Sequence, residues 1–184
     1  MNIPNALTLS RIAMIPLFVV VFYLPIQSAH LLAALLFGVA ALSDLLDGFL
    51  ARRLDQTSEL GAFLDPVADK LMVAVALVLL VQAHPSVWLA LPAAVIIGRE
   101  VAVSALREWM AELGARSKVA VSSLGKIKTT AQMVALILLI YREPIGFVPV
   151  YPIGFVLHYL AAVLTFWSMC RYLWLAWPRL LGER

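Results

Sequence analysis

Six long apolar runs, separated by short polar breaks, account for most of the chain. A helix needs about 20 residues to cross a hydrocarbon core, and each run is close to that length. The first run ends near Pro25, and the others cover residues 31–52, 61–83, 87–109, about 119 or 124 to 141, and 153–174, with Pro178 ending the last helix. The pattern predicts an all-α, polytopic membrane protein with six transmembrane helices.

The polar residues 2–11 ahead of the first run carry helix-start chemistry. Asn5 can cap free backbone amides, and Pro4 discourages helix upstream of it. We therefore expect a short N-terminal interfacial helix that runs into the first span. Residues 12–24 have the length of a signal-peptide core, but no small-x-small cleavage site follows them. A retained first membrane helix is the interpretation we favour.

Composition supports a membrane protein. The chain is 63% hydrophobic with a mean hydropathy of +0.95, whereas soluble domains are roughly half apolar. A length of 184 residues predicts one domain, residues 1–184. The single cysteine, Cys170, excludes an internal disulfide, and no cysteine–histidine cluster has zinc spacing.

The placement of lysine and arginine predicts the orientation of the chain, because cytoplasmic loops are rich in these residues. The loops at 52–60 and 110–120 and both termini carry half of them, while the opposite loops carry only Arg142. Both termini are therefore expected in the cytoplasm. Trp88, Trp174 and Trp177 fall at predicted span ends, where aromatic rings act as membrane anchors.

Four aspartates interrupt the second and third apolar runs, within residues 44–69. Asp44 and Asp47 are three positions apart, and Asp65 and Asp69 are four apart, so each pair shares one face of its helix. Both pairs lie near the cytoplasmic loop, with Asp44 and Asp69 at a depth of roughly 12 Å at 1.5 Å per residue. Two such helices facing each other would bring the carboxylates around one point, and intramembrane acids usually mark a functional site.

Oxygen ligands without histidine or cysteine suit Mg²⁺ or Mn²⁺. Two such ions would balance four carboxylates and could clamp both oxygens of a phosphoryl displacement. Gly48 and Ala51 leave room on the face of Asp44, and Arg52 can hold a phosphate.

Two other interpretations compete with a metal centre. In one, the aspartates are buried carboxylates paired with cations, for which Lys70, Arg99 and Arg107 are available. In the other, the protein is a cation-coupled transporter, since transporters also hold intramembrane acids. The sequence shows no half-repeats or broken mid-bilayer helices that would favour transport.

The aspartate stretch reads D-x2-D-G-x2-A-R-x8-G-x3-D-x3-D, which resembles the signature of the CDP-alcohol phosphatidyltransferase family at every specified position. Within that family, several segments resemble the bacterial branch that uses sn-glycerol 3-phosphate as acceptor. These segments are residues 2–11, 62–70, 98–100, 105–110 and 125–132.

The resemblance implies transfer of a phosphatidyl group from CDP-diacylglycerol to the hydroxyl of sn-glycerol 3-phosphate, with release of CMP. It implies that the four aspartates bind two Mg²⁺ or Mn²⁺ ions and that Asp69 is the general base. It further implies a homodimer in the bacterial cytoplasmic (inner) membrane, with the site facing the cytoplasm. Residues carried over as contacts of the CDP portion are Gly48, Ala51, Arg52 and Gly61.

The acceptor site is less closely defined by the sequence. A dianionic phosphate needs cations, and Arg107 and Lys126 are the candidates at the cytoplasmic ends of their spans. We interpret Lys128 as a positive-inside residue, Arg99 as a structural partner of Glu100, and Lys70 as a snorkelling or interhelix residue. Thr8 and Arg11 could approach the nucleotide, although capping and interfacial anchoring also explain them. Inositol phosphate, serine or a second phosphatidylglycerol are alternative acceptors.

Overall fold

The computed structural model describes the backbone of residues 3–54, 59–112 and 123–180. These residues form six α-helices and no strand, with one isolated bridge between Ile145 and Val148. The helices are α1 (Ile3–Phe22), α2 (Ala29–Leu54), α3 (Glu59–Ala83), α4 (Val87–Glu112), α5 (Ser123–Tyr141) and α6 (Val150–Leu180). The predicted all-α class is confirmed, and each helix overlaps one predicted apolar run.

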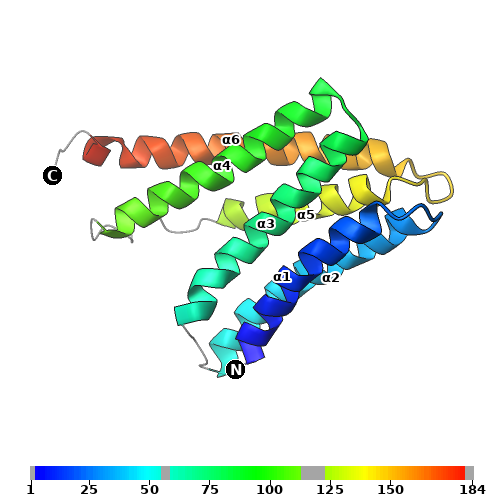
Figure 1. The fold of residues 1–184 in the computed structure, drawn as a ribbon. Coiled ribbons are helices and arrows are strands. Elements are labelled where there is room, and N and C mark those ends of the chain that lie inside the picture. Colours follow the sequence, from blue (N-terminus) through cyan, green and yellow to red (C-terminus); the bar gives the residue numbers. More distant parts are fainter. Residues whose placement is uncertain (1–2, 55–58, 113–122, 181–184) are drawn as a thin grey trace.

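Figure 1 shows α1, α2 and α3 side by side, with α4 packed across α6. Helix α5 joins the two groups, because it packs against α6 on one side and against α2 and α3 on the other. The hydrophobic core runs through this contact region and includes Phe18, Phe37, Leu77, Leu80 and Leu139, each at most 2% exposed. Lipid is as apolar as these side chains, so their close packing, and not their removal from water, holds membrane-embedded helices together.

Two predictions about the helix ends are wrong. The amino-terminal helix runs into the first span as expected, since α1 is continuous from Ile3, but Asn5 lies inside this helix and is not its cap. Pro4 falls in the first turn, where a missing N–H costs no hydrogen bond. Pro178 does not end the last helix, which continues to Leu180. Prolines also lie inside α1 and α4, at Pro16 and Pro92, and apolar helices tolerate them when neighbouring helices hold the backbone.

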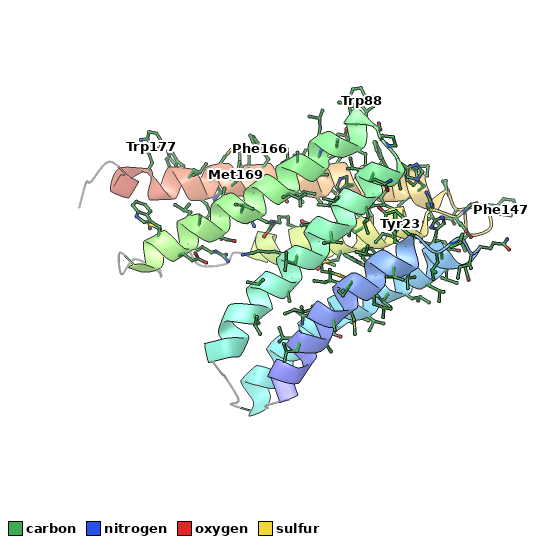
Figure 2. The ribbon with its side chains drawn as sticks, in the orientation of Figure 1. Tyr23, Trp88, Phe147, Phe166, Met169 and Trp177 are labelled. Carbon is green, nitrogen blue, oxygen red and sulfur yellow. The ribbon has the colours of Figure 1, made fainter. Side chains whose placement is uncertain are left out.

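Two helices among the described residues are long and apolar enough to cross a membrane, Val87–Met110 and Val150–Trp174. Shorter apolar segments lie in α1, α2 and α5, at Thr8–Phe22, Ala29–Ser43 and Lys128–Tyr141. The side chains of Trp88 and Trp177 point away from the bundle and are 67% and 57% exposed (Figure 2). This exposure is what membrane anchoring by these rings requires.

Arg142 ties three segments together at the end of the bundle where α3 and α5 finish. Its guanidinium donates to the imidazole of His84, just after α3, with Nη1 2.5 Å from Nε2, and to the imidazole of His30 at the start of α2. Burial, and then the charge of Arg142, lower the pKa of His84 below 6.5. A neutral imidazole is the form that can accept this hydrogen bond.

The closest approach of α5 and α6 depends on Gly154. A Cβ atom there would lie 2.9 Å from Leu138 Cβ and 3.1 Å from the backbone nitrogen of Leu139. Gly38 of α2 also faces α5, but its nearest neighbour would be Ile137 Cδ1 at 3.8 Å, an ordinary contact. Of these two glycines, only Gly154 lies so close to a neighbouring backbone that a larger side chain would clash.

We predict that Gly154→Ala lowers the thermal unfolding temperature of the detergent-solubilised protein, because overpacking against backbone typically costs about 1–3 kcal/mol. Gly38→Ala is the matched control and should be neutral or mildly stabilising, since alanine is the better helix former. Equal unfolding temperatures for the two variants would contradict the packing described for α5 and α6.

Candidate functional site

The four aspartates lie on helical backbone in α2 and α3, as the sequence predicted. Asp44 and Asp47 are in the second half of α2, and Asp65 and Asp69 are in the first half of α3. Helical spacing therefore places each pair on one face of its helix. The side chains of Asp44, Asp47 and Asp65 lie outside the described residues, as do those of Gly48, Ala51, Arg52 and Lys126.

Asp69 shows which way the acidic face of α3 is turned. Its half-buried side chain lines a small cavity whose other walls come from α1, α2 and α5. The remaining lining residues are Arg11, Phe37, Ala40, Ala41, Met72 and Met133. The face of α3 that carries Asp69 is thus turned toward α2, the helix that carries the other aspartate pair.

Arg11 and Thr8 are placed in the bundle interior and not at an interface. They are three positions apart on α1, and each is 1% exposed. Arg11 lines the same cavity as Asp69, so a buried guanidinium and a carboxylate share one site. Interfacial anchoring, one of the two explanations considered for Arg11, is therefore wrong. Gly61, the other described residue proposed near the nucleotide, is buried at the start of α3.

The donor chemistry of this region fits hard divalent cations. Carboxylates at same-face spacing on two neighbouring helices supply only oxygen ligands, which suit Mg²⁺ or Mn²⁺. Among the side chains that the structure describes, no group of three or more histidine, cysteine, aspartate or glutamate residues could hold a metal. Of the four aspartates, only Asp69 is among these described side chains.

A second group of charged residues connects α4, α5 and α6. Glu100 Oε1 accepts from Arg99 Nη1 at 2.8 Å and from Lys128 Nζ at 3.4 Å. The predicted Arg99–Glu100 pair is confirmed. Lys128 is only 4% exposed, so it is a buried partner of Glu100, and its interpretation as a positive-inside residue stays a prediction. Gln132 could have indicated from the sequence that Lys128 is buried, because it is a second polar residue four positions away on the same helical face. In the structure Gln132 is also 4% exposed.

The remaining two cations also contact neighbouring helices. Lys70 Nζ donates to Ser104 Oγ on α4, which confirms Lys70 as an interhelix partner. Arg107 is exposed, and its Nη2 donates to Tyr172 Oη on α6 at 3.4 Å, with the guanidinium carbon 5.7 Å from the ring centroid. The described contacts of Lys70, Arg99 and Arg107 thus go to groups other than the aspartates.

Comparison with known proteins agrees with the site. The sequence model of the CDP-alcohol phosphatidyltransferase family matches residues 1–167, which include all four aspartates.

Several curated relatives are similar over nearly the whole chain. A protein of Pectobacterium atrosepticum named CDP-diacylglycerol--glycerol-3-phosphate 3-phosphatidyltransferase is 61% identical over 173 residues, which is 94% of this chain and 93% of the relative. Proteins of the same name from Shigella flexneri serotype 5b and Salmonella typhimurium are each 57% identical over 182 residues, 99% of this chain and 98% of each relative. The chain belongs to the CDP-alcohol phosphatidyltransferase family.

Proposed function

We propose that the protein transfers the phosphatidyl group of CDP-diacylglycerol to sn-glycerol 3-phosphate, giving phosphatidylglycerophosphate and CMP in phospholipid biosynthesis. The observation that carries this proposal is the near-full-length similarity, at 57–61% identity, to relatives named for that reaction. The family signature falls on α2 and α3, and Asp69 is turned toward α2, which supports a reaction site between these two helices.

Asp44, Asp47, Asp65 and Asp69 would hold two divalent ions, Mg²⁺ or Mn²⁺, which when bound neutralise the diphosphate and polarise the acceptor hydroxyl. Asp69 takes the proton of that hydroxyl, whose oxygen then attacks the phosphorus that carries diacylglycerol. The bond from this phosphorus to the bridging oxygen breaks, and its electron pair leaves with CMP. Arg52 stabilises the charge that develops on the departing phosphate.

The donor and acceptor are bound by different helices in this proposal. Gly48, Ala51, Arg52 and Gly61 contact the CDP portion, and Thr8 approaches it from α1, where its side chain is buried toward the bundle interior. Arg107 and Lys126 bind the acceptor phosphate. Arg107 is suited to this role because it is exposed and its guanidinium is held over the ring of Tyr172.

The proposed setting is the bacterial cytoplasmic (inner) membrane, which six transmembrane helices of one domain, residues 1–184, would cross. Both termini and the site would face the cytoplasm, where soluble acceptor is available, while the acyl chains of the donor stay in lipid. Two apolar helices of spanning length support a membrane location. We also propose that the protein is a homodimer.

The first prediction concerns the acceptor. Purified protein given CDP-diacylglycerol, Mn²⁺ and sn-glycerol 3-phosphate should release CMP, measured by chromatography of the nucleotide products. Inositol phosphate, serine and phosphatidylglycerol, tested one at a time, should each give less than about a tenth of that rate, because a site that pairs buried polar groups with its substrate discriminates strongly. Faster release with another acceptor would reassign the substrate, and no release with any acceptor or metal would favour a transport protein.

The second prediction concerns Asp69. Asp69→Asn should lower kcat by about 10²–10⁴-fold, the usual contribution of a general base, while the affinity for CDP-diacylglycerol changes little. Asp55→Asn, at an unspecified position of the signature between Arg52 and Gly61, is the matched control and should turn over at the unaltered rate. A kcat for Asp69→Asn within threefold of the control would remove the base assignment.

A further inference from the structure

Glu100 is the carboxylate at the centre of the charged group on α4, α5 and α6. Its Oε1 atom accepts from Arg99 Nη1 at 2.8 Å and from Lys128 Nζ at 3.4 Å. The side chains are well enclosed: Lys128 is 5% exposed, Arg99 11% and Glu100 24%. One carboxylate therefore holds two buried cations, which leaves this group of three with a net positive charge.

Arg99 has hydrogen-bonding capacity that the protein leaves unused. Its Nη2 reaches Ser168 Oγ on α6 at 3.3 Å, and its guanidinium carbon lies 6.0 Å from the ring centroid of Tyr172. Its Nε atom is buried and has no hydrogen-bond partner among the described residues. Buried polar atoms are normally satisfied, so an unpaired donor beside a net positive charge is suited to an anionic ligand.

The backbone of Glu100 is linked to the proposed reaction site through two hydrogen bonds. Ser104 Oγ donates to the carbonyl oxygen of Glu100 at 2.6 Å, and Ser104 in turn accepts from Lys70. Lys70 follows Asp69 directly on α3. These two hydrogen bonds thus join the backbone of α4 at Glu100 to the helix that carries the proposed base.

We propose that Glu100 is a positioning residue, which holds Arg99 and Lys128 in place so that they bind the phosphate of the acceptor together with Arg107 and Lys126. This inference rests on the proposed function and deepens it, because it adds to the acceptor site a pair of cations held in place before the acceptor arrives. Two enclosed cations repel each other, and a lysine without a partner at such a position loses its proton or turns away. Glu100 prevents both outcomes.

A purely electrostatic role for Glu100 leads to the opposite expectation. Its negative charge would repel the phosphate, so removing it would strengthen acceptor binding. If Glu100 positions the cations, removing its charge weakens acceptor binding because Lys128 is no longer held. The direction of the change in KM for the acceptor therefore separates the two roles.

The test measures steady-state kinetics of the full-length protein with CDP-diacylglycerol, sn-glycerol 3-phosphate and Mn²⁺. Glu100→Gln should raise KM for sn-glycerol 3-phosphate at least tenfold and change KM for CDP-diacylglycerol less than twofold. Glu100→Asp, which keeps the charge on a shorter side chain, should recover part of the loss. Glu108→Gln, an exposed glutamate on the same helix, is the matched control and should behave as the unaltered protein.

Each outcome has a distinct meaning. An unchanged or lowered acceptor KM in Glu100→Gln, or an equal rise for both substrates, would overturn the positioning role and leave the proposed function standing. Absence of turnover by the unaltered protein would remove the function and this inference together. If Glu100→Gln fails to fold, Glu100→Asp decides the matter, because a rise in the acceptor KM alone supports the proposal and unchanged constants refute it.

Discussion

Ionised carboxylates are costly inside an apolar helical bundle, and the arrangement of this protein follows from how that cost is met. The structure shows two solutions. Between α1, α2 and α3, Asp69 shares a cavity with the buried guanidinium of Arg11. Between α4, α5 and α6, Glu100 is bound directly by Arg99 and Lys128. In the proposed account, metal ions neutralise the aspartates at the first place, and the acceptor's phosphate binds the two cations at the second.

Helix α3 connects these two regions. Consecutive residues on a helix point about 100° apart, so the side chains of Asp69 and Lys70 reach different neighbouring helices. Asp69 lines the cavity beside α1 and α2, while Lys70 donates to Ser104 on α4. One helix can therefore set the distance between a donor held by α2 and α3 and an acceptor held by α4 and α5. Helix α5 holds the α1–α3 group against α4 and α6, because it packs against α2, α3 and α6.

The periodic features of the fold could be predicted from the sequence, because each apolar run is long and its ends carry turn residues. The faces of the aspartate helices followed from spacing alone. The positions of long cationic side chains could not be predicted in this way. The sequence indicated interfacial anchoring for Arg11 and the positive-inside rule for Lys128, yet both residues are nearly fully buried. The groups around them come from other helices, and the spacing of residues along one helix does not reveal which helices will face each other.

The central claim is that the four aspartates hold a pair of divalent ions. The most direct test counts Mn²⁺ bound per chain in metal-depleted, detergent-solubilised protein with CDP-diacylglycerol present, by electron paramagnetic resonance of the free ion. The account predicts about two ions per chain, as in other two-metal sites, and fewer in Asp44→Asn and Asp65→Asn. Less than one ion per chain in the unaltered protein, or full occupancy in both variants, would contradict it.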